Sequence, residues 1–385
     1  MKLSFQLAYK NLIGAGLRTW LNVAVLSFAF VIIIFFNGVI DGWNQQARIE
    51  GVKWEYGHGQ LLNENYDPFD PFSMQDGHDV FPKEAAGNLT PILIRQATIY
   101  PEGRMVSVVL KGIDADQSVL ELPTKLLQAS DAEIPCIIGK RMAASANLKV
   151  GDQVLMRWRD GNGTFDAANI TVAGIFDTDV GTVDNGQIWM AIDKLWDMTG
   201  LDGHATMFVA SEGYEHKLIQ GWKFDSQEEL LSELSKIIEM KKTSSSIMYV
   251  LLLAIALLAI FDTQVLSIFR RQKEIGTYVA LGMTRMQVVG LFTVEGSMYS
   301  LFAMVVGCLY GIPFFIYMAN TGIAIPAPTQ EMGVTIGERI FPAFGAGLVF
   351  GTTLLVVISA TIVSFLPTRR IAKMDPVTAL KGKLI

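Results

Sequence analysis

The sequence has little charge and almost no cysteine. Charged residues make up 18% of its 385 residues, against about 25% in soluble domains, while apolar residues make up 51%. The high apolar content excludes a disordered chain, and the net charge of −6 excludes a nucleic-acid binder that relies on overall basic charge. With only Cys136 and Cys308, the chain is not a disulfide-stapled scaffold.

The motifs of common catalytic sites are also missing. There is no G-x-x-x-x-G-K-[ST] loop to hold the phosphates of ATP, and no H-E-x-x-H, C-x-x-C or G-x-S-x-G pattern. We therefore expect no catalytic residue, no metal site and no cofactor bound by this chain. The chain is expected not to be an enzyme by itself, and to move something or to transmit force.

Long apolar runs are what the sequence does contain. A helix that crosses a bilayer needs about 20 mainly apolar residues, and four segments meet this need. We place the spans at residues 20–40, 246–269, 288–319 and 340–366. The predicted fold class is an α-helical membrane protein with four transmembrane helices plus an α+β periplasmic domain.

The charges predict the orientation of these spans. Residues 41–245 hold 18 basic and 31 acidic residues, a net charge of −13, whereas the remaining chain is basic. Lys and Arg are concentrated before the first span, between the second and third spans and after the fourth, which places these parts in the cytoplasm. Both termini are then cytoplasmic, including the tail 367–385, and residues 41–245 and 320–339 lie outside.

The first 19 residues have basic and apolar side chains on opposite helical faces. We interpret residues 1–19 as an amphipathic helix on the cytoplasmic membrane surface. The alternative is a plain extension of the first span.

The external segment has short strand-like runs separated by turn signals. The expected strands are 91–100, 105–111, 153–159, 169–176 and 187–192, and the expected helices are 140–146 and 226–240. Residues 160–163, Asp-Gly-Asn-Gly, read as a hairpin tip. Cys136 lies in an apolar run and is expected to be a buried side chain rather than a reactive thiol.

The most informative stretch is the cytoplasmic loop 270–287. A span ends at two arginines, a short helix with apolar residues follows, and Gly282 ends it before the chain returns to the membrane. An exposed helix of this kind is suited to a groove on a partner protein. The alternative is a simple interfacial helix.

Three separated motifs resemble the FtsX/MacB-type (type VII) ABC transporter permeases. The loop matches the family pattern at six positions: Glu274, Gly276, Leu281, Gly282, Thr284 and Glu295. The tail has a basic cluster followed by D-P-x-x-A-L at residues 375–380, and the start has A-x-[KR]-N-L at residues 8–12. The layout is closest to the lipoprotein-releasing system permeases (LolC/LolE-like).

The resemblance implies an organisation and partners. The external domain would be a MacB-like periplasmic core, with a porter-like part (41–119 and 206–245) and a β-rich insertion (120–205). The partners would be an ABC ATPase subunit that carries ATP and Mg, a second permease copy or homologue, and possible lipoprotein and periplasmic acceptor proteins, in the bacterial inner membrane. The hairpin at 160–166 is short and lacks proline, whereas family members that dock a lipoprotein chaperone carry an extended loop there. The resemblance therefore implies no chaperone docking by this chain, or docking by a partner subunit.

The resemblance also implies a coupling site in the loop. The ATPase-coupling residues would be Arg270, Arg271, Glu274, Ile275, Gly276, Tyr278, Leu281 and Gly282. Two intramembrane polar residues are Asp262, expected in an interhelical hydrogen bond or a coupling role, and Glu295, expected to pair with Arg285 or with a partner. Candidate residues of a substrate cleft are Phe28, Phe35, Leu252 and Ile255, for which plain packing or lipid contact is the alternative.

Three functions compete at this point. The first is a permease that couples ATP hydrolysis by a separate ATPase to lipoprotein extraction by mechanotransmission. The second is a permease of a tripartite-type efflux system, and the third is a signal transmitter that activates a cell-wall hydrolase.

Overall fold

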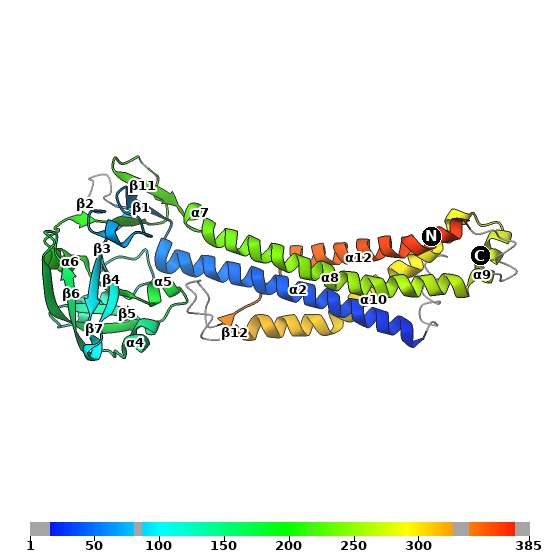
Figure 1. The fold of residues 1–385 in the computed structure, drawn as a ribbon, viewed down its shortest axis with the longest axis horizontal. Helices are drawn as coiled ribbons and strands as arrows, with labels where there is room; N and C mark the ends of the chain where they lie inside the picture. The colour runs from blue at the N-terminus through cyan, green and yellow to red at the C-terminus, as the bar shows by residue number, and fades with distance from the viewer. Residues whose placement is uncertain (1–15, 81–86, 217, 326–338, 374–385) are drawn as a thin grey trace. The chain divides into compact units, whose positions relative to one another are not determined.

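A computed structural model describes the chain except for residues 1–15, 81–86, 217, 326–338 and 374–385 (Figure 1). The expected surface helix at 1–19 therefore lies mostly outside the described residues. The chain divides into two compact units. The first, here the helical unit, holds residues 1–42, 238–323 and 341–385, and the second, here the sheet unit, holds residues 43–237 and 324–340.

Four long helices make up most of the helical unit and extend in part beyond it. They are α2 (Leu17–Gly51), α8 (Ser232–Arg270), α10 (Arg285–Thr321) and α12 (Ala346–Thr368). All four are long and apolar enough to cross a membrane. The fourth helix begins six residues later than the predicted span, because Pro342 lacks a backbone N–H and Gly345 has extended backbone at the N-cap. Short elements of this unit are α9 (Gln272–Ala280) and η5 (Arg369–Lys373).

Glycines bring α10 close to two other helices. A Cβ atom added to Gly307 would lie 3.0 Å from Phe30 of α2, and one added to Gly311 would lie 3.0 Å from Val31, so the missing side chains allow the two helices to approach closely. A Cβ atom on Gly296 would lie 2.8 Å from Nε2 of Gln264 and closer still to Ser364 of α12. The sequence analysis missed Gly296 as a packing residue.

Three glycines at the start of α12 make no such close contact. A Cβ atom added to Gly345, Gly347 or Gly351 would meet no atom of another part of the described chain within 4 Å. Gly345 stands at the N-cap of α12, and the other two face away from the helical unit's core. A small residue permits close packing only on the face that another helix covers.

A polar contact joins α2 to α8. The amide of Asn22 donates to Oγ1 of Thr263 at 2.6 Å and to the carbonyl of Ala259 at 3.3 Å. The adjacent Asp262 is exposed instead, and within the described part of the chain its carboxylate makes no interhelical hydrogen bond. The hydrogen-bonding role expected of Asp262 is thus performed by its neighbour Thr263.

The sheet unit is built around a nine-stranded sheet. Its strands follow the order β11-β1-β10-β3-β4-β8-β5-β7-β6, and an additional pairing between β3 and β6 closes six of them into a ring. The bounds are β1 (Gly59–Asn63), β3 (Leu89–Ile99), β4 (Val106–Ile113), β5 (Pro135–Gly139), β6 (Gln153–Arg159), β7 (Phe165–Phe176), β8 (Gln187–Ala191), β10 (Met207–Ala210) and β11 (Trp222–Ser226). The pairs β4–β8 and β5–β7 are parallel, and the other pairs are antiparallel.

Helices and small elements fill the connections of this unit. They are η1 (Val52–Tyr56), η2 (Pro71–Met74), β2 (Asp79–Val80), η4 (Pro101–Gly103), α3 (Lys125–Ala129), α4 (Lys140–Ala146), α5 (Gly181–Asp184), α6 (Ile192–Thr199), β9 (His204–Ala205) and α7 (Gln227–Leu230). Outside these connections lie β12 (Ile323–Ala324) and β13 (Arg339–Ile340).

The expected strands and the expected helix 140–146 are confirmed, several within one or two residues. The expected helix 226–240 is instead divided at Leu231 into α7 and the start of α8. The predicted helix 140–146 and strand 153–159 have the observed bounds. The hairpin tip is also confirmed, since Oδ1 of Asp160 accepts from the amides of Asn162 and Thr164. Cys136 is fully buried, and burial raises the pKa of its thiol to about 12, so the thiol stays protonated at neutral pH.

Strands from both predicted parts of the external segment belong to the same sheet. The β4 strand, from the part before residue 120, pairs with β8 from the 120–205 segment, and β3 pairs with β6. Segments 41–119 and 120–205 thus contribute strands to one hydrogen-bonded sheet. Their division into a porter-like part and an insertion stays a prediction.

Two glycines of α10 provide a matched test of the helix packing. We expect Gly296→Ala to lower the unfolding free energy of the chain in detergent by about 1–3 kcal/mol, because its methyl group overlaps Ser364. Gly290 has open space around it, so Gly290→Ala is expected to raise stability by up to about 1 kcal/mol through helix propensity. Thermal unfolding of the two variants checks both signs. If both substitutions changed the unfolding free energy equally, the close contact of Gly296 with α12 would be contradicted.

Candidate functional site

The short helix α9 lies between the ends of two long helices. The chain leaves α8 at Arg270, and Arg271 has non-helical backbone angles of −106° and 22° that start a new helix direction. After Ala280 the chain turns at Gly282, whose φ of +100° is rarely adopted by residues with a side chain. Thr284 then caps α10, because its hydroxyl accepts from the amide of Gln287. The loop 270–287 is thus a defined helix with a break on each side.

One face of α9 is buried and the other is exposed. Ile275 is 1% exposed and packs with Ile268, Val288, Phe292 and Ile371. We expected an exposed helix with apolar residues, and this is wrong for Ile275. Its side chain packs against the neighbouring helices and is not available to a partner protein. The exposed side consists of Lys273, Thr277 and Ala280, followed by Leu281 at 79% exposure.

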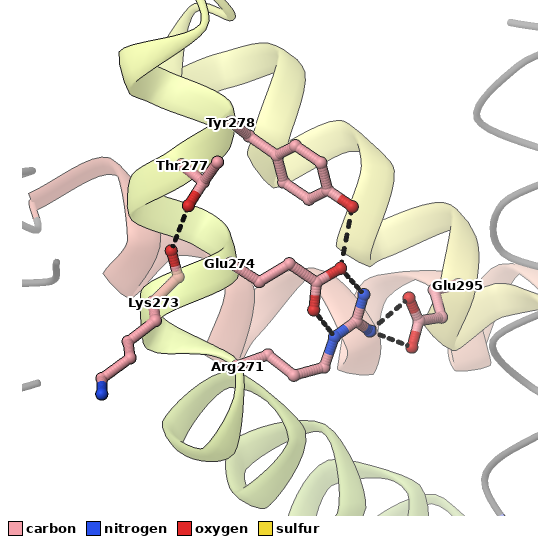
Figure 2. Close-up of polar contacts among 6 residues, drawn as sticks. All are labelled: Arg271, Lys273, Glu274, Thr277, Tyr278 and Glu295. Carbon is pink, nitrogen blue, oxygen red and sulfur yellow. Dashed lines mark hydrogen bonds and ion pairs between the residues drawn. The ribbon is translucent and has the colours of Figure 1, made fainter.

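A guanidinium at the start of α9 joins this helix to α10 (Figure 2). Arg271 forms a two-pronged pair with Glu274, with Nε to Oε2 at 2.6 Å and Nη2 to Oε1 at 2.7 Å. Its Nη1 donates to both carboxylate oxygens of Glu295 on α10, at 2.8 and 2.9 Å. The hydroxyl of Tyr278 donates to Oε1 of Glu274 at 2.8 Å. One cation therefore fixes the start of α9 to α10.

The Glu295 carboxylate and the Arg271 guanidinium are largely shielded from water, so each depends on the other to balance its charge. Glu295 is 7% exposed, and the Arg271 guanidinium stacks on the ring of Phe292 at 4.7 Å. A buried carboxylate needs a cation and hydrogen-bond donors to remain charged. Glu295 pairs with Arg271 and not with Arg285, whose guanidinium donates to the carbonyl of Ala372. The expected Arg285 partner is thus corrected to Arg271.

The pKa shifts agree with this network. Hydrogen bonds from Arg271 lower the pKa of Glu274, against the opposing effect of burial. For Arg271, burial lowers the pKa, but the hydrogen bonds and charges of Glu274 and Glu295 outweigh it and raise the pKa overall. Burial, together with the nearby Glu274 carboxylate, raises the pKa of Tyr278. At neutral pH the tyrosine is a donor, and the arginine and Glu274 are charged.

The structure brings together only part of the predicted coupling set. Arg271, Glu274 and Tyr278 meet in the network, and Ile275 and Gly276 form the buried side of α9. Arg270, Leu281 and Gly282 are exposed.

The four residues of the predicted substrate cleft have different surroundings. Phe28 and Ile255 are exposed, at 58% and 66%. Phe35 contacts the rings of Phe36 and Phe314, and Leu252 packs against the core of the helical unit.

The sequence analysis did not identify two groups of residues in this site, the apolar residues that pack against α9 and the polar residues on its exposed face. Phe292 and Ile371 complete the site from α10 and η5, and nothing in their local sequence indicates contact with Arg271 or Ile275. Lys273 and Thr277 belong to the exposed face of α9. The four-residue spacing of these polar residues, opposite Ile275 and Val279, could have indicated it.

Removing the central cation tests the network. We expect Arg271→Gln to destabilise the chain by up to about 3–5 kcal/mol, because it leaves Glu295 buried without a cation. The double variant Arg271→Gln with Glu295→Gln is expected to be more stable than Arg271→Gln alone. Thermal unfolding of the full chain in detergent measures both.

The matched control for this prediction is Arg270→Gln. Arg270 is adjacent, has the same charge and is exposed, so its loss is expected to change the unfolding temperature little. If Arg270→Gln and Arg271→Gln lowered the unfolding temperature equally, the hydrogen bonds of Arg271 would not be what stabilises the site.

Known proteins are similar in sequence to the segment that holds this network and to the chain as a whole. Residues 246–376, which include α9 and the helices on both sides of it, match the FtsX-like permease C-terminal family. The chain is 21% identical over 408 aligned positions to the lipoprotein-releasing system transmembrane protein LolC of Neisseria meningitidis, with 94% of each chain covered. It is 20% identical to LolC of Xylella fastidiosa over 65% of each chain. It is 28% identical over 33% of its length to the pyoverdine export ATP-binding/permease protein PvdT of Pseudomonas fluorescens, 17% of which is covered.

The family match covers the segment that holds the Arg271 network, and the LolC similarity extends over nearly the whole chain. Together with four helices of membrane-spanning length, these findings identify a membrane protein. Residues 246–376 thus carry an FtsX-like permease domain, and the chain as a whole resembles the ABC transporter permease LolC.

Proposed function

We propose that this permease couples ATP hydrolysis by a separate ATPase subunit to the extraction of lipoproteins from the bacterial inner membrane. The similarity to LolC over 94% of both chains is the observation that carries the proposal. The sequence has no phosphate-binding loop of its own, so ATP and Mg would be bound by the partner. Both termini and α9 would lie in the cytoplasm, and the sheet unit in the periplasm.

The coupling step would begin at the exposed face of α9. Lys273, Thr277 and Leu281 present a short, mixed polar and apolar surface that suits a groove on an ATPase. A displacement of α9 would act on α10 through the pair of Arg271 with Glu295, and on α8 because the chain passes directly from Arg270 to Arg271. We infer that Arg271, Glu274 and Glu295 position this helix, while its exposed face makes the contact.

The helix α8 would carry the displacement onward. It runs without interruption over 39 residues, about 58 Å at the rise of an α-helix, and its first residues belong to the sheet unit. A continuous helix of this kind can transmit a displacement from the nucleotide-dependent subunit to a periplasmic domain. This is the mechanotransmission that we propose for a pair of permease subunits.

The apolar nature of the spans supports a lipid-attached substrate. The 20–40, 288–319 and 340–366 spans are mainly apolar, and a polar solute would require a hydrophilic path through them. Phe28 and Ile255 are exposed apolar side chains that could contact acyl chains at a lateral opening.

The local similarity to a pyoverdine exporter favours a second candidate, export of a small molecule from the periplasm. In both cases the α9 site would perform the same coupling.

Breaking α9 tests the coupling role. Gly276→Pro is expected to reduce ATP-dependent substrate release to background while the chain still inserts, because proline disrupts the helix. The measurement uses the permease purified with its ATPase and reconstituted in proteoliposomes, and Gly351→Ala, at an open position of α12, is the control. Wild-type release by the proline variant would contradict the coupling assignment.

The substrate class is tested separately on the same complex. Mass spectrometry of intact lipidated proteins identifies what is bound before and after ATP is added. A bound lipoprotein that ATP releases supports extraction, whereas capture of a periplasmic adaptor without lipoprotein supports export of another substrate.

A further inference from the structure

A cavity of about 300 Å³ lies in the sheet unit, far in sequence from the coupling site. It lies between η2 and the strands β3 and β6, with the first residue of β7 at its edge. Its size is at the lower end of small-molecule sites in proteins, which range from about 300 to 1,000 Å³. Three arginines and three aromatic residues line it: Arg95, Arg157, Arg159, Phe72, Trp158 and Phe165.

Strand register places two of these arginines on one face. Thr98 on β3 is opposite Arg157 on β6, and Arg159 is opposite Phe165 on β7. Since side chains alternate between the faces of a strand, Arg157, Arg159 and Phe165 project on the same side. The guanidinium carbons of Arg157 and Arg159 lie 4.8 and 5.3 Å from the centre of the Phe165 ring. The ring therefore holds two cations close together.

Hydrogen bonds leave donors of these cations available. Arg159 donates to the carbonyl of Gly163 and to Oε1 of Gln75. Within the described residues, Arg157 has its ring contact but neither a hydrogen bond nor an ion pair. A guanidinium stacked on an aromatic face keeps its N–H edges directed outward, where they can bind an oxyanion.

The third arginine adds positive charge beneath the cavity. Arg95 is 4% exposed, and its guanidinium donates to the carbonyls of Met74, Gln75 and Asp160. Oδ1 of Asp160 accepts two backbone hydrogen bonds of the hairpin turn. Among the described residues, none of the three guanidiniums lining the cavity forms an ion pair with a carboxylate.

This concentration of positive charge contrasts with the rest of the segment. Residues 41–245 have a net charge of −13, and the carboxylates of Asp76 and Asp160 lie near enough to Arg95 to offset part of its charge. The exposed pair Arg157 and Arg159 therefore provides the positive charge that attracts an anion here. Two exposed rings border it, with Phe72 at 87% and Phe165 at 61% exposure. Exposed aromatic side chains beside arginines are typical of binding sites.

We propose that this cavity binds a phosphate or carboxylate group attached to a flat apolar body. Arg157 and Arg159 bind the oxyanion, and Phe72 and Phe165 cover the apolar part. The proposal does not depend on the substrate of the permease. The anion could come from a soluble molecule or from a lipid headgroup, and the experiment separates these two sources.

The probe is phenyl phosphate, titrated calorimetrically into the full chain in phosphatidylcholine nanodiscs at low salt. We expect saturable binding at least tenfold tighter than that of inorganic phosphate, and a tenfold loss of affinity in Arg157→Gln. The matched control is Arg104→Gln, whose arginine is exposed in the same unit and pairs with Glu102, and it is expected to bind like the wild type.

Repeating the titration in phosphatidylglycerol nanodiscs identifies the source. Weaker binding of phenyl phosphate there means that the anionic headgroup competes for the cavity, which assigns the site to a lipid headgroup. Equal binding in both lipids assigns it to a soluble anion. Absence of saturable binding, or equal affinity of Arg157→Gln and Arg104→Gln, would overturn the proposal.

Discussion

The pairing of one guanidinium with two carboxylates is the interaction on which the coupling site depends. Glu295 lies within α10, about 15 Å along the helix from Arg285, in a position where a carboxylate has little contact with water. Its charge can persist only if a cation is brought to it. Arg271 supplies that cation from the junction of α8 and α9, and the same guanidinium holds Glu274. The direction of α9 is thereby set by an electrostatic requirement of α10.

The surrounding helices make this arrangement stiff. Gly296 follows Glu295 directly, and its missing side chain allows α12 to approach at Ser364. Ile275 and Phe292 are buried on the same side of the loop, so the ion pair is supported by apolar packing. Both kinds of contact hold α9 against its neighbours, which is what the proposed coupling role requires.

The sequence predicted much of the architecture and little of the pairing between distant segments. Apolar runs located the four long helices, and turn signals located strands such as Gln153–Arg159. Local patterns could not show that Arg271 meets Glu295, 24 residues later, or that β3 pairs with β6 across about 60 residues of sequence, because such contacts depend on the tertiary fold. They also could not distinguish Gly296, which is covered, from Gly351, which is open.

The short helix α9 also shows what local sequence patterns cannot predict. The motif with Glu274 and Gly282 correctly located a short helix ended by a glycine, but it did not show which of its apolar residues are covered. Ile275 faces inward because Ile268, Val288, Phe292 and Ile371 surround it, and Ile371 comes from η5, which follows the last long helix in the sequence. Which side of an amphipathic helix is free follows from what the rest of the chain covers.

The coupling role of α9 requires its exposed face to contact the ATPase. The most direct measurement is the rate at which a maleimide labels Thr277→Cys in the permease alone and in its complex with the ATPase. Thr277 is exposed, the native Cys136 is buried, and the partly exposed Cys308 is replaced by alanine in both variants. We predict that labelling of Thr277→Cys slows at least tenfold in the complex, while labelling of Arg104→Cys, at an exposed position of the sheet unit, does not. Unchanged labelling of Thr277→Cys in an assembled, ATP-hydrolysing complex would contradict this contact.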